Sequence, residues 1–306
     1  MAKEKLMANK EHNKKYKIGI IGCGGMVGGA MWRYFEKKSN YRLFLFDKHK
    51  EIGSIGEVNK ADFVYVCVPT DYIEGKGCDT SIVDEVIGQL TGSKVVIIKS
   101  TIIPGTTEKL QKKYSQHRLL HNPEFLTEQT ADQDMNYPDR QIVGYTNKSY
   151  TIAKDVMQQL PLAPFERIVP SFIAEFVKYG GNTWFSVKVG KNNELYDLFM
   201  ASGKTDEEFE QMISCMAADK RIGRTHLKIM HRGKRGYSGT CLPKDSKALL
   251  GMARELGVEM PILAATDKYN DKLLKSQGLD ILGRDKGLEK VEEDLDTISS
   301  SGKFVK

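Results

Sequence analysis

The fold is decided by the stretch Lys17-Ile18-Gly19-Ile20-Ile21-Gly22-Cys23-Gly24-Gly25-Met26-Val27-Gly28-Gly29-Ala30. Its apolar start, 17–21, predicts a buried strand of a parallel sheet. The glycines that follow predict a loop, and the amphipathic segment 31–38 predicts a helix. Strand, glycine loop and helix in this order are the context in which a dinucleotide phosphate binds. Gly22 and Gly24 match the first two glycines of GxGxxG, but Gly28 comes one residue late. We therefore interpret the loop as one residue longer than usual.

The second predicted strand, 41–46, ends in an acidic residue, Asp47. An acid about 20 residues after the glycines is where the ribose diol of a dinucleotide is held. Asp47 therefore favours NAD over NADP, although the basic cluster at 48–50 would suit a 2′-phosphate, and Asp47 could also be a simple turn residue. The candidate cofactor contacts in this part of the chain are Gly22, Gly24, Gly25, Met26, Val27, Gly28 and Asp47.

Strands and helices alternate along the next hundred residues. Strands are expected at 62–68, 94–98, 118–121 and 140–145, and helices at 81–90, 106–114 and 150–160. This alternation predicts an α/β fold with a Rossmann-type doubly wound parallel sheet. Ligands of such sheets bind beyond the carboxyl ends of the strands. Further candidate cofactor contacts follow two of those ends: Val68, Pro69, Thr70, Ser100 and Thr101.

The pattern becomes mainly helical after Pro170, with helices expected at 171–201, 206–217, 243–256 and 261–275. The pair Gly180-Gly181 costs about 1 kcal/mol per glycine relative to alanine in a helix. It therefore predicts close approach by another element or by a ligand. Lys178 and Asn182 are four residues apart and share a helix face. A buried lysine there would be a functional candidate, whereas an exposed one would only be solvated.

Composition limits the possible partners. The formal net charge is +6, and residues 1–17 hold +4 of it (six lysines less two glutamates), so the charge marks a tail more than a nucleic-acid groove. No apolar run has membrane-spanning length, and none follows the first lysines as in a secretory signal. Five cysteines without a CxxC pair predict reduced thiols, a cytoplasmic location and no metal site.

Four segments are expected: a flexible basic tail at 1–16, an NAD-binding domain at 17–170, a helical domain at 171–277 and a charged, flexible tail at 278–306. The helical domain holds the stretch Gly236-Tyr237-Ser238-Gly239-Thr240-Cys241-Leu242-Pro243-Lys244-Asp245. Pro243 can begin a helix, which places Cys241 at a helix N-terminus, where the dipole and Lys244 favour the thiolate. Cys241 is therefore a candidate nucleophile, with a structural cysteine in a glycine-rich loop as the alternative.

Eight short motifs follow one another along the chain: Val68-Pro69-Thr70; Lys99-Ser100-Thr101 with Pro104-Gly105-Thr106-Thr107; Asn122-Pro123-Glu124-Phe125-Leu126 with Glu128; Pro138-Asp139-Arg140; Glu175 through Lys178-Tyr179 to Asn182; Asn193-Glu194; Arg221-Ile222-Gly223; and the stretch around Cys241. In this order, over residues 17–275, they resemble the UDP-glucose/GDP-mannose dehydrogenase family. The resemblance implies oxidation of a sugar C6 alcohol to a carboxylate by two hydride transfers to NAD.

The resemblance also implies roles for individual residues. Cys241 would trap the aldehyde as a thiohemiacetal and then carry a thioester, while Lys178 and Asn182 would stabilise the oxyanion. Asp245 with Lys178 would position water and move a proton. Glu128 would be the general base for thioester hydrolysis and a cofactor contact, and Lys244 would be a further cofactor contact. Thr101 and Glu124 would orient water and substrate, and Arg221 would reach across a homodimer interface to the neighbour's substrate. The implied substrate contacts are Phe125, Leu126, Tyr237 and Gly239.

The sequence departs from the family pattern at several positions. The substituted positions are Asp71, Gln129, Ser238, Thr240 and Leu242, and none of them removes a catalytic group. Family members also continue into a second αβ domain that holds the nucleotide, and the thirty residues after the last predicted helix are too few for it. The sequence is therefore expected to lack that C-terminal nucleotide-sugar-binding domain.

Three functions are compatible with these observations. The first is a nucleotide-sugar 6-dehydrogenase acting on UDP-glucose, with GDP-mannose or an N-acetylated UDP-sugar as alternatives. The second is a single-step dehydrogenase of the 3-hydroxyacid or 6-phosphogluconate type, which uses a lysine but no cysteine. The third is a nucleotide-binding partner that is not an enzyme and needs another chain.

Overall fold

The computed structural model describes residues 16–74 and 77–284. The predicted flexible tail at 1–16 lies outside the described residues except for Tyr16. Of the predicted tail at 278–306, residues 278–284 are described, and Leu279 among them is buried. The chain divides into two compact units. We call residues up to 73 together with 78–178 the sheet unit. Residues 74–77 and those from 179 onward are the helical unit. The division falls inside one long helix, between Lys178 and Tyr179.

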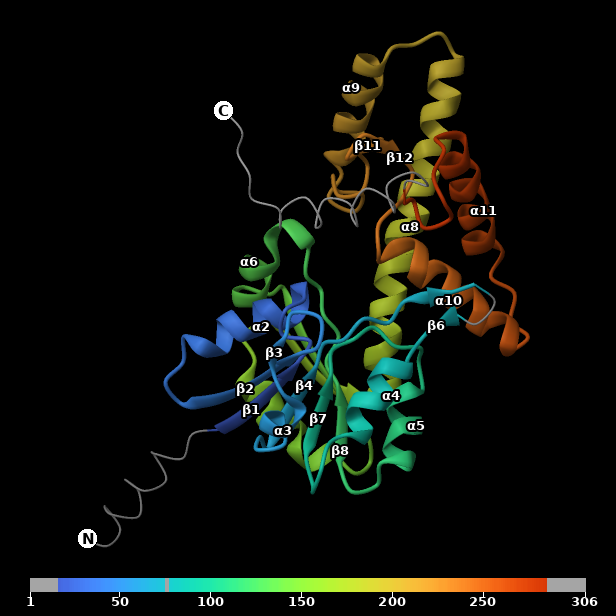
Figure 1. The fold of residues 1–306 in the computed structure, drawn as a ribbon. Helices are drawn as coiled ribbons and strands as arrows, with labels where there is room; N and C mark the ends of the chain where they lie inside the picture. Colours follow the sequence, from blue (N-terminus) through green and yellow to red (C-terminus); the bar gives the residue numbers. More distant parts are fainter. Residues whose placement is uncertain (1–15, 75–76, 285–306) are drawn as a thin grey trace, which may run out of the picture. The chain divides into compact units, whose positions relative to one another are not determined.

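One sheet of eight strands organises the described part of the sheet unit, in the spatial order β10-β9-β8-β7-β4-β1-β2-β3 (Figure 1). Its strands are β1 (Tyr16–Ile21), β2 (Tyr41–Asp47), β3 (Ile52–Gly53), β4 (Phe63–Val66), β7 (Val95–Ile98), β8 (Arg118–His121), β9 (Arg140–Tyr145) and β10 (Phe165–Pro170). The chain runs from β1 to β2 on one side and later returns to β4 on the other, so the strand order reverses beside β1. The carboxyl ends of β1 and β4 are therefore where this fold binds a ligand.

Apolar residues face both sides of this sheet, as a doubly wound fold requires. Phe63 and Tyr65 pack on one face with helices α2 (Met26–Glu36), α6 (Ala131–Asn136) and α7 (Ala153–Gln159). Val64 and Val66 pack on the other face with α3 (Ile55–Val58), α4 (Ser81–Gly88) and α5 (Thr106–Lys113). The alternation follows from the period-2 geometry of a strand, and it confirms the predicted Rossmann-type α/β class.

The sheet is mixed, whereas a wholly parallel sheet was predicted. Strand β9 pairs antiparallel with β8, and the two-residue β3 pairs antiparallel with β2. Strand β10 extends β9 in parallel at the sheet edge and was not predicted. Its side chains are mostly exposed, so it lacks the buried apolar pattern by which the inner strands are recognised.

Helix α2 begins at Met26, five residues earlier than the segment 31–38 predicts. Its first turns contain Gly28 and Gly29, which the sequence interpretation assigned to the loop. Four further short elements are β5 (Tyr72–Ile73) and β6 (Gly77–Cys78), which precede α4, and the 3-10 turns η1 (Glu128–Thr130) and η2 (Tyr150–Ile152), which precede α6 and α7.

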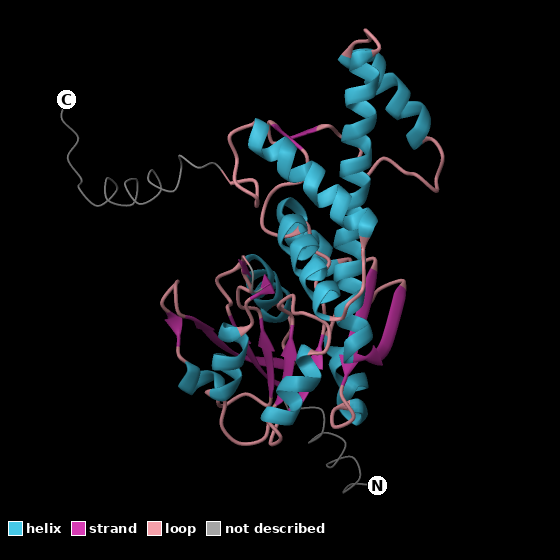
Figure 2. Cartoon of the chain, turned by 90° about the vertical axis from the view of Figure 1, so that its right-hand side faces the viewer, coloured by secondary structure: helices cyan, strands magenta, loops and turns pink. Residues whose placement is uncertain are grey.

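Helices make up most of residues 179–284 (Figure 2). They are the later part of α8 (Ser171–Ala201), α9 (Asp206–Ala217), α10 (Leu242–Glu255) and α11 (Pro261–Ser276), with a small hairpin of β11 (Met230–His231) and β12 (Lys234–Arg235). Helix α9 starts with the capping box of Thr205 and Glu208. Across the residues described, no helix combines the length and apolarity needed to cross a membrane.

Candidate active site

The glycine loop and the N-terminus of α2 form a site suited to the pyrophosphate of NAD. The loop follows β1, and α2 begins directly after it at Met26, with Gly25 as its N-cap. Among the described residues, no side chain caps α2, and its first turn contains no acidic residue. A helix N-terminus with these properties attracts anions through its amide groups and dipole. The geometry therefore fits the cofactor that the sequence predicts.

Gly28 supplies the close packing expected of the third glycine in the motif. A Cβ atom at Gly28 would lie 2.1 Å from the carbonyl oxygen of Gly22. Only glycine lets the first turn of α2 approach the loop this closely. Gly28 takes this place from within α2 and not from within the longer loop that the sequence predicts.

Asp47 lies beside this loop, at the end of β2. One carboxylate oxygen accepts a hydrogen bond from the Gly24 amide at 2.8 Å, and the other accepts from the amides of His49 and Lys50 at 3.0 Å each. An ionised carboxylate has about four acceptor sites, so it can take one more partner. Asp47 therefore stabilises the turn at the end of β2, and its carboxylate also lies beside the glycine loop, as the ribose-binding interpretation requires. The side chains of Lys48, His49 and Lys50 are exposed.

The loops after β4 and β7 are tied to each other, which brings together candidate residues that lie thirty positions apart. The Thr70 hydroxyl donates to the Thr101 carbonyl at 2.7 Å, and the Ser100 hydroxyl donates to the Val68 carbonyl at 2.7 Å. Both loops follow carboxyl ends of parallel strands next to the order reversal, where a dinucleotide is expected. The sequence correctly places these segments at one edge of the sheet.

A buried ion pair joins two predicted catalytic residues within the sheet unit. The Lys178 ammonium lies 2.6 Å from the Glu124 carboxylate and also donates to the Glu124 carbonyl at 2.9 Å. Both side chains are more than nine-tenths buried. Burial acts to raise the pKa of Glu124, but Lys178, the Leu126 amide and Lys99 together outweigh it and leave the pKa lowered. The alternative of a solvated Lys178 is therefore wrong.

Lys99 is a second buried lysine at this position, and the sequence interpretation gave it no role. Its ammonium donates to the Asn122 side-chain oxygen at 2.7 Å and to the Asn122 carbonyl at 3.3 Å. Burial lowers the pKa of Lys99 to about 8. The sequence feature that could have identified Lys99 is its position directly after a buried strand, at the carboxyl edge of the sheet.

Three other predicted residues lie in the loop after β8. Phe125 is covered by the Arg140 guanidinium, 3.9 Å from the ring centroid, and Leu126 packs against the sheet core. Glu128 is exposed at the start of η1. Residues 122–127 are not helical, so Glu124 and Glu128 do not share a helix face, although they are four residues apart.

In the helical unit, Cys241 lies exposed at the N-terminus of α10. It is the N-cap residue, and Pro243 follows in the first turn, as predicted. A sulfur at this position lies at the positive end of the helix dipole. Exposure also argues against the alternative of a buried structural cysteine.

Asp245, one turn into α10, is buried and holds two other candidate residues. One carboxylate oxygen accepts from the Asn182 amide at 2.5 Å, and the other lies 2.6 Å from the Lys244 ammonium. Asn182 is itself buried on α8. The helical unit thus brings Asn182 to Asp245, from which it is 63 positions away in the sequence, and to the neighbouring Lys244.

The remaining substrate candidates have different surroundings. Tyr237 is buried and its hydroxyl donates to Asp267 at 3.2 Å; burial, with Asp267 nearby, raises the pKa of this phenol. Gly239 is open to solvent, with none of the described atoms within 4 Å of a Cβ placed there. Arg221 is exposed and pairs with Asp219 at 2.6 Å.

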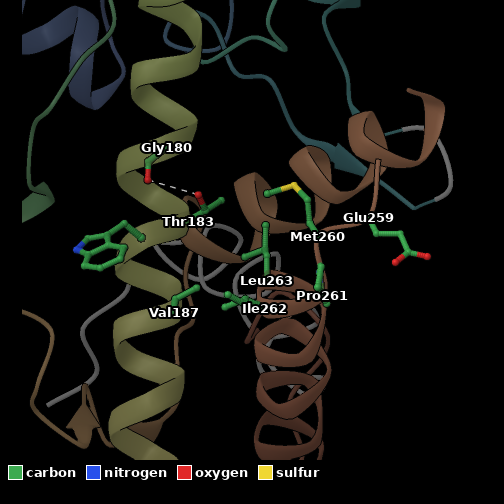
Figure 3. Close-up of a pocket in the computed structure, with 9 residues that line it drawn as sticks. Gly180, Thr183, Val187, Glu259, Met260, Pro261, Ile262 and Leu263 are labelled. Atoms are coloured by element: carbon green, nitrogen blue, oxygen red, sulfur yellow. Dashed lines mark hydrogen bonds between the residues drawn. The ribbon is translucent and has the colours of Figure 1, made fainter. Parts of the chain in front are cut away.

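A pocket of about 450 Å³ lies within the helical unit, between α8 and the start of α11 (Figure 3). Its wall is mainly apolar and includes Trp184, Val187 and Ile262. Gly180 lines it, and no described atom lies within 4 Å of a Cβ placed there. The predicted close approach of another element at Gly180 is therefore wrong for the described residues, while the alternative of a ligand there stays a prediction.

Comparison with known proteins agrees with this geometry. The model of the UDP-glucose/GDP-mannose dehydrogenase family NAD binding domain matches residues 47–160, and that of the family's central domain matches 173–272. The UDP-glucose 6-dehydrogenase of Pseudomonas aeruginosa is 32% identical over 230 residues, covering 69% of this chain and 48% of that protein. The enzyme of the same name from Rhizobium meliloti is 29% identical over 74% of this chain and 53% of its own length. The chain thus spans about half the length of the curated relatives it matches.

Solved structures share the fold. A UDP-glucose dehydrogenase from Pyrobaculum islandicum superimposes with a TM-score of 0.74 at 21% identity, covering 93% of this chain and 72% of that one. A 3-hydroxyisobutyrate dehydrogenase from Mycobacterium tuberculosis gives 0.67 at 15% identity, covering 89% and 96%. The fold alone is therefore common to both enzyme classes, and the family models distinguish between them. The sheet unit is an NAD-binding domain, and the chain belongs to the UDP-glucose/GDP-mannose dehydrogenase family.

Proposed function

We propose that this protein oxidises the C6 alcohol of a nucleotide sugar, with UDP-glucose as the first candidate, to the carboxylate. The observation that carries the proposal is the exposed Cys241 at the N-terminus of α10, one turn before the buried Asp245 that Asn182 holds. A single-step dehydrogenase has no use for such a cysteine. Family membership supplies the reaction class.

Each of the two oxidations would use one molecule of NAD, held by the sheet unit, as the acceptor of the C6 hydride. In the first, the alcohol also loses its hydroxyl proton, which we assign to water positioned by Asp245 and Lys178. The Cys241 sulfur then adds to the aldehyde carbon, and the carbonyl oxygen gains a proton, which gives a thiohemiacetal. Asn182 and Lys178 are N–H donors suited to the charge that develops on this oxygen.

The second oxidation removes a hydride from C6 and a proton from the thiohemiacetal hydroxyl, which leaves a thioester on Cys241. Water then adds to the thioester carbon, the carbon–sulfur bond breaks, and the products are the sugar carboxylate and the free cysteine. We assign the base for this water to Glu128, whose exposed position suits proton exchange with solvent. Thr101 and Glu124 would orient the water and the substrate.

The number of NADH molecules formed per sugar consumed tests the proposal directly. We expect two with UDP-glucose, or with GDP-mannose or an N-acetylated UDP-sugar if one of these is the substrate. One NADH per sugar would indicate a single-step dehydrogenase. None, with NAD still bound, would indicate a nucleotide-binding partner that is not an enzyme.

Replacement of the cysteine tests the covalent step. Cys241→Ser should stop formation of the acid while NAD binding, measured by fluorescence titration, stays unchanged. Cys215→Ser is the matched control, because Cys215 is also exposed and lies on α9 of the same unit. Normal turnover to the acid by Cys241→Ser would refute the thioester.

We also propose a homodimer through the helical unit. Large apolar side chains are exposed on and near α8 and α11, the most exposed being Ile262 (71%), Leu198 (67%), Trp184 (66%) and Leu256 (65%). Such a concentration suits a protein interface. Arg221, which is also exposed, would then reach the substrate of the partner subunit.

A further inference from the structure

The segment that leads into Cys241 is bound to α11 by two side-chain amides. Asn270 accepts a hydrogen bond from the Tyr237 amide at 2.8 Å and donates to the Tyr237 carbonyl at 2.9 Å. Gln277 makes the same pair of bonds with the backbone of Arg235, at 2.8 and 3.1 Å. Asn270 and Gln277 are two helical turns apart, and their partners, Tyr237 and Arg235, lie on either side of Gly236. The two side chains thus satisfy the backbone N–H and C=O groups of both partners.

Asn270 is the stronger of these two anchors. It is 1% exposed, whereas Gln277 is exposed at the end of α11. Without Asn270, the buried N–H and C=O groups of Tyr237 would have no hydrogen-bond partner, which costs free energy of folding. The ring of Tyr237 is buried as well and its hydroxyl reaches Asp267 on the same helix.

Gly236 shows that the chain is adapted to this contact. It has φ of +80°, and a Cβ atom there would lie 2.5 Å from the side-chain oxygen of Asn270. The space beside Gly236 is therefore filled by Asn270. At Gly239, by contrast, the surroundings are open within the described chain.

We infer that Asn270 is a positioning residue for Cys241: it fixes the backbone at Tyr237, four residues before the sulfur, so that the loop 238–240 is short and held at both ends. Its other end is α10, where the Asp245 amide donates to the Cys241 carbonyl at 2.9 Å. A nucleophile must be held within a fraction of an ångström to react efficiently. This inference rests on the proposed function, in which Cys241 is the nucleophile.

Asn270→Leu removes both hydrogen bonds with little change in volume. We expect hydrogen exchange at the Tyr237 amide to quicken at least about tenfold, since each lost bond to a buried group is worth that much or more. We also expect the rate of Cys241 alkylation by iodoacetamide to change and kcat to fall by at least about tenfold with NAD affinity unchanged. Gly236→Ala should reproduce these effects by displacing Asn270.

Asn192→Leu is the matched control. Asn192 is a buried asparagine of the same unit whose amide donates to the Leu227 carbonyl, in a different loop. Asn192→Leu should lower the free energy of unfolding by about as much as Asn270→Leu does. It should leave hydrogen exchange at the Tyr237 amide and the alkylation rate of Cys241 unchanged. A purely structural role for Asn270 predicts that the two variants behave alike.

Asn270→Asp adds a readout that general destabilisation would not produce. A protonated aspartic acid can accept from the Tyr237 amide and donate to the Tyr237 carbonyl, whereas the ionised form can only accept. The ratio of its kcat to that of the wild type should therefore rise as the pH falls. Charged groups around this loop include Asp267 and Asp271 on α11, Lys247, Lys244 and Asp245 on α10, and Arg235 in the segment itself. These groups and the titratable Tyr237 hydroxyl are all unchanged in the variant.

Wild-type exchange at Tyr237 and wild-type alkylation of Cys241 in folded Asn270→Leu or Asn270→Asp would overturn the inference. These two measurements need no turnover. If the wild-type protein forms no NADH with any nucleotide sugar, the proposed function fails, and the exchange data still decide whether Asn270 anchors the loop.

Discussion

Lys178 and Glu124 form an ion pair in which each charge depends on the other. Both groups are buried and hydrogen-bonded, and Leu126 donates its amide to the second oxygen of Glu124 at 2.7 Å. Taking two charges out of water is costly, and close pairing offsets that cost. Removal of one partner leaves an uncompensated buried charge. The stability of the protein therefore depends on Lys178 and Glu124, to which we also assign roles in catalysis.

Lys178→Met should destabilise the protein by about 3–5 kcal/mol, measured by urea unfolding at pH 7. The double variant with Glu124→Gln should recover part of this loss. The matched control is Lys113→Met, which breaks the exposed pair with Asp84 and should change stability little. Equal effects of the two lysine substitutions would show that burial does not govern this pair.

The pH dependence of this pair has a definite sign. The pKa of Glu124 is lowered in the folded protein, so its contribution to stability is present above the unfolded-state pKa and is lost as the pH falls through the folded value. Glu124→Gln should therefore be less stable than the wild type at pH 7 and approach it in acid. Unfolding midpoints at pH 7 and pH 3.5 measure this, and a constant difference would contradict it.

At the scale of elements, the first turns of α8 are joined to the N-terminus of α5 by one buried carboxylate. Glu175 accepts hydrogen bonds from the amides of Gly105 and Thr107, at 2.6 and 2.8 Å, and from the Thr107 hydroxyl at 2.6 Å. These are orphan amides of a helix start, so a side chain from α8 caps α5. Burial nevertheless outweighs these bonds and raises the pKa of Glu175 to about 7.

This raised pKa predicts a pH effect opposite to that of Glu124. Between about pH 4.5 and 7 the folded protein binds a proton at Glu175 that the unfolded chain has lost, so stability falls as the pH rises. The free energy of unfolding of the wild type should therefore fall, relative to that of Glu175→Gln, by up to about 3 kcal/mol over this range. Urea unfolding of both proteins at pH 5 and pH 7.5 measures the shift, and its absence would refute the raised pKa.

The elements differ in how far the sequence predicts them. The strands β1, β4 and β7 were predictable because they are buried on both faces and read as continuous apolar runs. The start of α2 was not, because Gly28 and Gly29 disfavour a helix by local propensity, and only packing of Gly28 on Gly22 makes them helical. The edge strand β10 exposes most of its side chains and leaves no comparable pattern.

At the scale of the whole molecule, the proposed dimer makes a separate prediction. Ile262→Asp places a charge on the exposed apolar surface of the helical unit and should shift sedimentation from dimer to monomer. Residues 47–160 belong to the family's NAD-binding model, so NAD affinity should not change. The exposed Tyr150→Asp, on the sheet unit, is the control. A wild-type protein that sediments as a monomer would refute the dimer.

The sequence by itself determined the α/β class, the glycine loop before α2, the strand-end segments Val68–Thr70 and Ser100–Thr101, and a cysteine at the start of α10. Each depends on residues close together in the chain, whose periodicity, glycine content or helix-start chemistry is local. Only the tertiary structure decided that β9 runs antiparallel to β8, that Lys99 and Lys178 are buried beside the loop of Glu124, and that Asn270 fills the space next to Gly236. These features depend on contacts between residues more than twenty positions apart. Their hydrogen bonds and burial exist only once the chain has folded, so no local pattern specifies them.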